Sequence, residues 1–439
     1  MVAANVKIIE ELKSFLEIVA SDSEIRSLFT ENETDFTRDR KLTMERVVGI
    51  IINMPKRSLS IEIQDFFNSL GEDLDGCTKS AFSLQRAKLN PLFFTVWNKW
   101  LVDNFYLHYG KSVKRWRGFL LYAVDGSFAY LFNKEEVVNH FGTHRTAPMA
   151  RIMQIQDVLN DLSVWGGIYP FKKSEKAIIA EQIEQLRTDS LAIFDRGYPG
   201  FVLMYLMANQ EEPRNYLIRC PLTFNKEVIQ FVRSRKSNKI VEFKPSDKSI
   251  VTLKKNGIIV TKDTTIKVRM VKIRLPNGTI EILLTNLYNE KLYKLNDFKY
   301  LYNKRWGIET AYYKEKNQLQ MEQFSGHRVI CIEQDFAATL FVANLQSIIE
   351  KQCTDYLRSI NEKRKHNYKI NKNISIASLK NNIIHLFFTE TPELILIKLQ
   401  KMFERNIEPI RPDRQYERIS KVKNLNGKFQ TFTNYKRAV

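Results

Sequence analysis

Residues 119–127 read Phe-Leu-Leu-Tyr-Ala-Val-Asp-Gly-Ser, and this stretch decides the fold class. The apolar run ends at Asp125, which is the pattern of a strand buried on both faces of a sheet. A second run of this kind, residues 191–194, ends at Asp195 and continues as Arg-Gly-Tyr-Pro-Gly. A carboxylate at the end of a buried strand is costly unless it is paired or holds a metal. Since open α/β sheets place their sites at such strand ends, the two aspartates predict a functional site there.

The neighbouring segments predict the rest of the sheet and the helices that cover it. Further strands are expected at residues 151–158, 162–168 and 216–220, because these runs are apolar and rich in branched residues. Ser174 is a good N-cap for a helix that reaches about residue 187, and another helix is expected near residues 200–209. Strands followed by alternating strand and helix indicate a mixed sheet in an α/β arrangement.

A helix near residue 302 supplies the third part of the predicted site. At about 100° per residue, a set of polar and aromatic side chains falls within roughly 100° of one face. This set comprises Tyr302, Arg305, Trp306, Glu309, Tyr313 and Lys316. An amphipathic helix with an ordinary ion pair is the simplest alternative. A core-facing stripe would be aliphatic, however, so the mixture favours a surface that holds both a metal and a phosphodiester backbone.

The charge of the chain points to a polyanion as its partner. The 439 residues carry a formal net charge of +19, and the apolar fraction of 44% excludes a disordered or fibrous chain. No apolar stretch approaches the ~18–20 residues of a membrane span, so we expect no membrane partner. The four cysteines, which lie far apart without metal-ligand spacing, favour a reducing cytoplasmic setting.

Much of the positive charge lies in one segment, residues 221–285. Between Lys226 and Arg274 there are 14 Lys or Arg residues and 4 Asp or Glu residues. Strands are expected at 240–243, 258–261, 265–274 and 280–284, with hairpin turns at Asn256-Gly257 and Asn277-Gly278. A solvated surface is the ordinary explanation of such charge, but its density favours phosphate binding by an inserted β-rich module.

Both ends of the chain have helical spacing. Residues 1–110 form a predicted helical N-terminal region, and residues 351–439 a helical C-terminal region. Helical spacing also runs from about residue 295 through 356. From Arg405 onward the sequence is basic and aperiodic, which predicts a mobile tail.

Taken together, these motifs resemble the DDE transposases of bacterial insertion sequences, in the cut-and-paste family numbered four. The family's Tyr-x2-Arg-x3-Glu-x6-Lys signature is matched by Tyr302, Arg305, Glu309 and Lys316. Its two aspartate motifs are matched by Asp125-Gly-Ser and Asp195-Arg-Gly-Tyr. The resemblance implies a ribonuclease-H-like core formed by residues 111–220 and 286–350, with residues 221–285 inserted between them. It also implies DNA-end binding by residues 1–110 and dimerisation through residues 351–439.

The resemblance assigns roles to the site residues. Asp125, Asp195 and Glu309 would be catalytic and would bind two divalent ions, Mg²⁺ or Mn²⁺, which suit hard oxygen ligands. Tyr302, Arg305 and Lys316 would hold the phosphates near the cut, and Trp306 is included in this DNA-binding set. The enzyme would cleave terminal inverted repeats and join the 3′-OH ends to target DNA. We expect a homodimer, because two ends must be paired, in the bacterial cytoplasm with the nucleoid.

One departure leaves a step of the reaction open. Relatives that cut through a DNA hairpin stack a flipped base on a tryptophan in the insertion, whereas residues 221–285 contain none. Phe231 or Phe243 could substitute. Two other functions also remain as alternatives. A structure-specific or repair nuclease would cleave without inverted-repeat preference, and an architectural DNA-binding protein would need no acidic triad.

Overall fold

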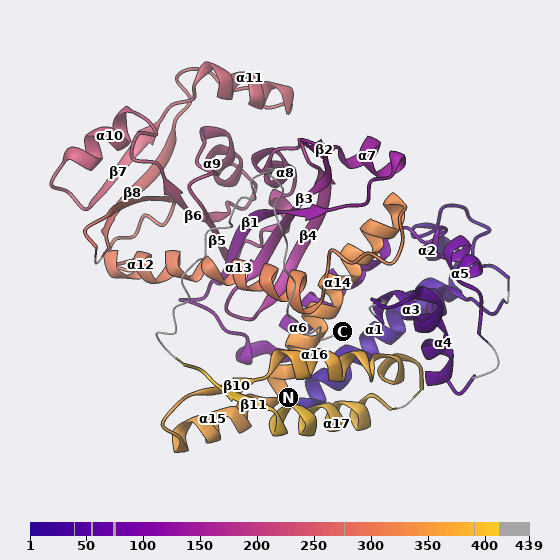
Figure 1. Cartoon of the computed structure of the whole chain (residues 1–439). Helices are drawn as coiled ribbons and strands as arrows, with labels where there is room; N and C mark the ends of the chain where they lie inside the picture. Colours follow the sequence, from indigo (N-terminus) through magenta and orange to yellow (C-terminus); the bar gives the residue numbers. More distant parts are fainter. Residues whose placement is uncertain (39, 54–55, 73–75, 276, 390, 412–439) are drawn as a thin grey trace, which may run out of the picture. The chain divides into compact units, whose positions relative to one another are not determined.

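The computed structural model describes residues 1–38, 40–53, 56–72, 76–275, 277–389 and 391–411. The chain forms two compact units, which are described separately below (Figure 1). The sheet unit comprises Asn90–Lys314 and Gly326–Asn344, and the helical unit comprises Met1–Leu89, Glu315–Ser325 and the chain from Leu345 onward.

The sheet unit is built on one large mixed sheet with helices on both sides. Its strands are β1 (Leu120–Tyr130), β2 (Thr143–His144), β3 (Ala147–Asp157), β4 (Leu162–Pro170), β5 (Ser190–Phe194), β6 (Asn215–Cys220), β7 (Asn238–Phe243), β8 (Ile266–Arg274) and β9 (Ile280–Thr285). Its helices are α6 (Leu92–Tyr109), η1 (Gly110–Ser112), α7 (Glu135–Phe141), α8 (Glu175–Glu181), η2 (Ile183–Gln185), α9 (Phe201–Ala208), α10 (Lys226–Arg233), α11 (Asp247–Lys255), α12 (Leu295–Lys304) and α13 (Trp306–Tyr313). This arrangement confirms the predicted mixed α/β fold.

The order of the strands brings the two aspartate motifs together. β5 pairs in parallel with β1 on one side and with β6 on the other, while β3 pairs antiparallel with β1 and β4. Val124 of β1 is the register partner of Phe194 of β5. Because Asp125 and Asp195 each follow one of these paired residues, they are neighbours across the strands.

The inserted segment continues the same sheet instead of forming a separate one. β6 pairs antiparallel with β9, β9 with β8, and β8 with β7. The predicted turn at Asn277-Gly278 is confirmed, with Gly278 at φ 81° between β8 and β9.

Helices α10 and α11 accompany the strands of the insertion. Two predictions were wrong here, namely the strand at residues 258–261 and the hairpin turn at Asn256-Gly257. The hydroxyl of Ser246 caps α11 by accepting a hydrogen bond from the Ser249 amide. Lys254 and Lys255 occupy its last turn, where cations favour a helix. Asn256 is its C-cap and Gly257 follows at φ 77°, so this Asn-Gly pair ends a helix instead of turning a hairpin.

One face of the sheet is covered by α12. Apolar side chains of five strands, among them Leu121, Ile193 and Leu217, form a buried cluster with Phe298 and Leu301 of this helix. Phe298 and Leu301 are three residues apart, so they lie on the same side of the helix. This packing fixes the helix over the strands that carry the aspartates.

The helical unit confirms the helical spacing predicted for both ends of the chain. Its elements are α1 (Val2–Ser21), α2 (Ser23–Ser27), α3 (Met44–Ile52), α4 (Leu59–Ser69), α5 (Lys79–Arg86), η4 (Lys351–Cys353), α15 (Thr354–Lys363), β10 (Tyr368–Ile370), α16 (Lys372–Lys380), η5 (His385–Thr389), α17 (Pro392–Arg405) and β11 (Ile407–Pro409). The buried stripe of α1, which includes Ile8, Leu12 and Leu16, has the predicted helical period. Helix α1 packs against α17, so the first and the last helix of the described chain share one core.

The helical run predicted for residues 295–356 is interrupted. A π-helical turn, η3 (Lys314–Gln318), ends at a non-helical stretch over residues 319–328, where Gln320 has φ 52°. Helix α14 (Val329–Glu350) then begins in the sheet unit and ends in the helical unit. Of the predicted basic tail, residues 412–439 lie outside the described residues. Within the described ranges, no helix combines the length and apolar character that a membrane span requires.

Candidate active site

The alternation of side chains along the strands directs both aspartates to the face covered by α12. Leu121 and Asp125 are four residues apart on β1, and Ile193 and Asp195 are two apart at the end of β5. Since side chains of a strand alternate between faces, each aspartate continues the row of its buried partner. The apolar rows that build the core therefore end in carboxylates.

Helices α12 and α13 continue from that core to the strand ends. Tyr302 lies one turn beyond Phe298 and is buried in the same cluster. Arg305, between the two helices, keeps right-handed helical dihedrals of φ −52° and ψ −34°. The helical direction therefore continues, and Glu309 follows Arg305 by four residues on the same face. Figure 1 shows α12 and α13 running one after the other along the sheet.

Each of the three carboxylates contacts a side chain of this helical segment. The Tyr302 hydroxyl donates to Asp195 Oδ1 at 2.9 Å. The Arg305 guanidinium donates to Asp125 Oδ2 at 3.4 Å and to Glu309 Oε1 at 2.9 Å. The structure therefore brings Asp125, Asp195, Glu309, Tyr302 and Arg305 together, although 184 residues separate the first carboxylate from the last.

Burial dominates the electrostatics of Asp125. Desolvation raises the pKa of its carboxyl to about 6, and the nearby carboxylates of Glu175 and Asp195 add to the increase. The Gly126 amide, 2.9 Å from Oδ1, and the Arg305 guanidinium oppose it. A carboxylate with a raised pKa in a polar site is a common feature of functional centres.

Arg305 is the only buried cation among the residues that touch the three carboxylates in the described structure, with 5% of its surface exposed. Burial lowers its pKa, but the phenol of Tyr302 and the surrounding carboxylates outweigh that effect and raise it. Its Nε atom is buried without a hydrogen-bond partner in the described structure. Since a buried unpaired donor is costly, this nitrogen has the capacity to bind one more acceptor.

Arg219 is a site residue that the sequence interpretation missed. It lies on β6 two residues after Leu217, so it points to the same face as the aspartates. Its guanidinium lies 4.0 Å from Asp195 Oδ1 and 3.0 Å from Glu281 Oε1. The available signal was a charged residue at a core-facing position of a buried strand.

A second set of residues that was missed lies beside Gly126. A Cβ atom at Gly126 would lie 2.5 Å from Glu175 Oε1, so a larger residue there would require the Glu175 side chain to move. The Glu175 carboxylate forms an ion pair with Arg151 and accepts a hydrogen bond from the Tyr198 hydroxyl at 2.9 Å. Tyr198 belongs to the second aspartate motif, and its hydroxyl thus contacts the side chain that packs on the first.

Trp306 and Lys316 are the remaining residues predicted to bind DNA. Trp306 is 48% exposed and lies under the Arg305 guanidinium, whose Cζ is 4.8 Å from the ring centroid. Trp306 also lines a cavity of about 260 Å³ together with Arg219 and Tyr302. Lys316 lies in the π-helical turn and belongs to the helical unit, where its Nζ is 3.7 Å from Glu322 Oε1.

The donor set fits a divalent cation chemically. Within the described ranges, no three His, Cys, Asp or Glu side chains are arranged as a metal site. Asp125 and Glu309 nevertheless already share one buried cation, the Arg305 guanidinium. Because Asp125, Asp195 and Glu309 offer only carboxylate oxygens, a hard ion such as Mg²⁺ is the metal they would hold.

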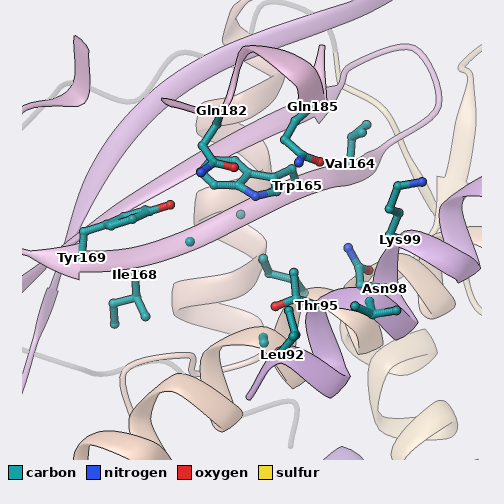
Figure 2. A pocket seen from close by; sticks show the side chains of 15 residues that line it. Leu92, Thr95, Asn98, Lys99, Val164, Trp165, Ile168, Tyr169, Gln182 and Gln185 are labelled. Atoms are coloured by element: carbon teal, nitrogen blue, oxygen red, sulfur yellow. The ribbon is translucent and has the colours of Figure 1, made fainter. Parts of the chain in front are cut away.

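A cavity of about 450 Å³ elsewhere in the sheet unit differs from this site. It lies at β4, where Figure 2 shows the rings of Trp165 and Tyr169 beside Gln182 and Gln185, with Leu92 and Thr95 of α6 across the strand. None of the three candidate carboxylates lines it. It therefore offers no comparable acid chemistry.

Comparisons with known proteins found similarities to transposases. Residues 159–345 match a family model described as Transposase DDE domain, a range that includes Asp195 and Glu309. A relative, the Transposase InsG for insertion sequence element IS4 of Escherichia coli (strain K12), is 22% identical over 338 residues, which cover 73% of each chain. A piggyBac transposase structure, a synaptic complex with hairpin DNA, aligns at a TM-score of 0.40 and 10% identity over 92% of this chain and 81% of that one.

Proposed function

This chain is a DDE transposase of the IS4 family, an enzyme of DNA cleavage and strand transfer, and from that premise we propose that Asp125, Asp195 and Glu309 are its catalytic carboxylates. One observation carries the proposal. Three acidic side chains from three distant segments converge on two partners, with Tyr302 bound to Asp195 and Arg305 bound to Asp125 and Glu309. Carboxylates gathered in this way bind cations.

DDE transposases generally use divalent metal ions, and the three carboxylates would bind two of them, Mg²⁺ or Mn²⁺. Such ions, when bound, activate the attacking oxygen and stabilise the leaving oxygen of an in-line phosphoryl displacement. Although burial raises the pKa of Asp125 to about 6, this carboxyl is still mostly ionised at neutral pH and can bind a cation.

The remaining side chains of the site would hold the DNA backbone. The unpaired Nε of Arg305 supports a phosphate contact, because a phosphate oxygen is a strong acceptor for a guanidinium. Tyr302 would position Asp195 and face the DNA strand that Arg305 contacts. The exposed ring of Trp306 would stack on a base or sugar. Lys316 would join this set when DNA is bound.

The substrates would be the terminal inverted repeats of the element and its target DNA. Water would be the first nucleophile and the freed 3′-OH the second, so the chain needs no covalent protein–DNA intermediate. Two ends must be joined to one target, which favours a homodimer in the synaptic complex. Residues 1–110 would bind the DNA ends, and residues 351–439 would form the dimer interface. The protein would act at the nucleoid in the bacterial cytoplasm.

The test uses the purified full chain, DNA carrying the element's ends, and Mg²⁺. We expect nicking at the ends and joining of 3′-OH strands to a plasmid. Asp125→Ala and Glu309→Gln should each reduce cleavage by at least about 10³-fold, because several kcal/mol of stabilisation would be lost at ~1.4 kcal/mol per tenfold. The matched control is Glu290→Gln, an exposed glutamate away from the three carboxylates, which should keep normal rates.

Two outcomes would contradict the proposal. Normal cleavage by Glu309→Gln would remove this residue from the triad. Cleavage without inverted-repeat preference and without joining of 3′-OH ends would favour the alternative, a structure-specific or repair nuclease on the same core.

A further inference from the structure

The sheet unit contains a cleft of about 750 Å³ between helices α8, α9 and α11, on the side of the Asp195 loop that bears Tyr198. Lys176 and Lys248 line it from α8 and α11, and Val202 and Leu206 from α9. We propose that this cleft binds the sugar-phosphate backbone of a DNA strand. The inference rests on the proposed function, since it takes DNA as the substrate, and it adds a second contact beyond the triad.

The two lysines make the cleft a site for an anion. Burial lowers the pKa of Lys176, and the positive charge of the nearby Lys248 lowers it further. The Lys176 Nζ donates to the Pro199 carbonyl oxygen at 2.9 Å, which holds the ammonium at the entrance of the cleft. Two cations held close to each other gain stability when a phosphate is bound between them.

The acidic side chains nearby already have other partners. Glu181, which lines the cleft, accepts from Lys173 at 2.6 Å, and Asp247 pairs with Lys262 at 3.0 Å. Across the described part of the chain, neither Lys176 nor Lys248 forms an ion pair with a carboxylate. Their charge is therefore available to a ligand.

Backbone groups and apolar side chains complete the match to a nucleic-acid strand. Helix α9 begins at Gly200 without a side-chain cap, so its first amides and the positive end of its dipole supplement the lysines. The Lys176 Nζ lies 4.0 Å from the position of a Cβ on Gly200. Val202, Leu206 and Ile258 supply an apolar wall of the kind that packs on deoxyribose. A free inorganic anion would use the lysines but not this wall.

The cleft is also connected to the candidate active site. Tyr198, which lines it, and Pro199, which holds Lys176, follow Asp195 within one loop. A strand bound in the cleft would therefore contact the loop that carries a catalytic carboxylate.

The experiment measures DNA binding without divalent ions, so that its outcome does not depend on the triad. A fluorescein-labelled duplex of arbitrary sequence is titrated with the full chain in EDTA at several KCl concentrations, and anisotropy gives the binding constant. Lys176→Gln and Lys248→Gln should each reduce the slope of log K against log salt by about 0.9, the value for one phosphate contact. The matched control is Lys254→Gln, an exposed lysine of α11 outside the cleft, which should keep the normal slope.

Acetylation of the unmodified protein provides a second measurement that does not depend on variant folding. DNA should protect Lys176 and Lys248 from acetic anhydride, as read by mass spectrometry, and should leave Lys254 reactive. Equal slopes for Lys248→Gln and Lys254→Gln, or equal reactivity of Lys248 with and without DNA, would overturn the proposal. Metal-dependent cleavage lost in Glu309→Gln would still support the transposase function in that case.

Discussion

The two halves of the sheet differ in the charge of their side chains. In the half formed by β4, β3, β1, β5 and β6, acidic side chains follow the buried apolar runs of β1 and β5, and each touches a basic or phenolic partner. In the inserted half, formed by β9, β8 and β7 with α10 and α11, basic residues predominate. Some of those basic residues are structural, so the net charge of a segment overstates what it offers to DNA.

Arg269 and Lys272 of β8 illustrate this difference. Arg269 is 1% exposed and donates hydrogen bonds to Asn238 and to the carbonyl oxygens of Leu287 and Tyr293. Lys272 donates to two carbonyl oxygens at the end of α10. Their charges hold the insertion onto the sheet, whereas Lys248 faces a cleft. Structural cations and cations that face a ligand therefore differ in burial, which cannot be read directly from the sequence.

The largest effect on stability is expected for Arg269→Met. The variant leaves the Leu287 and Tyr293 carbonyl oxygens buried without their donor, so the free energy of unfolding should fall by about 3 kcal/mol. Urea denaturation measures it. Arg274→Met, at the exposed end of the same strand, should change stability by no more than about 0.5 kcal/mol. A similar loss in both variants would show that Arg269 has no special structural role.

Asp125→Asn should have the opposite effect, because it should increase the free energy of unfolding of the metal-free protein. The pKa of Asp125 is raised from 3.8 to about 6, so the folded chain binds this proton more tightly than the unfolded chain. Its contribution to stability is therefore complete below pH ~4 and is lost as the pH rises to about 6. At pH 7.5 the neutral amide should stabilise the chain by about 2 kcal/mol while abolishing cleavage.

Urea denaturation in EDTA at pH 7.5 and at pH 4 tests this sign. The gain from Asp125→Asn should shrink at the lower pH, because the carboxyl of the unmodified protein is then protonated. A gain of equal size at both values would mean that ionisation of Asp125 is not its cause.

A smaller effect is expected for Tyr198→Phe. The change removes the hydroxyl that donates to Glu175, so the free energy of unfolding should fall by about 1 kcal/mol. Thermal denaturation measures the shift, and a cleavage assay shows whether the Glu175 contact also supports Asp125. Tyr300→Phe is the control, since Tyr300 is 47% exposed and its ring contact with Lys304 remains possible.

The smallest effect is expected for Lys244→Gln in the insertion. Its partner Asp263 is 93% exposed and 3.4 Å away, and such surface ion pairs contribute only about 0.2–1 kcal/mol. Stability in urea should therefore stay within about 0.5 kcal/mol of the unmodified protein. A loss as large as that of Arg269→Met would remove the distinction between buried and surface cations in this half of the sheet.

Much of the fold and site followed from local patterns. The apolar runs before Asp125 and Asp195 were correctly predicted as buried strands, because a long apolar run has few structural interpretations. The predicted end of the first strand at Asp125 was wrong, since β1 continues to Tyr130. Tyr302, Arg305 and Glu309 were placed on one face by helical geometry, and the structure joins all three to the carboxylate set. Lys316 lies beyond α13 in a π-helical turn, which has a different angle per residue from the helix before it.

Other features depend on contacts between distant segments. Arg219 and Glu175 enter the site through the pairing of β6 with β9 and through the packing of α8 beside Gly126. Neither residue belongs to a motif, so local patterns could not identify them.

The sequence by itself determined which apolar runs form buried strands, which carboxylates follow these runs, and which helical residues share a face, because each depends on the short-range periodicity of the chain. Only the tertiary structure decided that Arg305 bridges Asp125 and Glu309, that the insertion extends the same sheet, and that Lys176 and Lys248 face one cleft. These depend on strand order and on packing between segments far apart in the chain. The energies of these contacts arise from desolvation and charge pairing, which occur only when the segments are packed together in the folded chain.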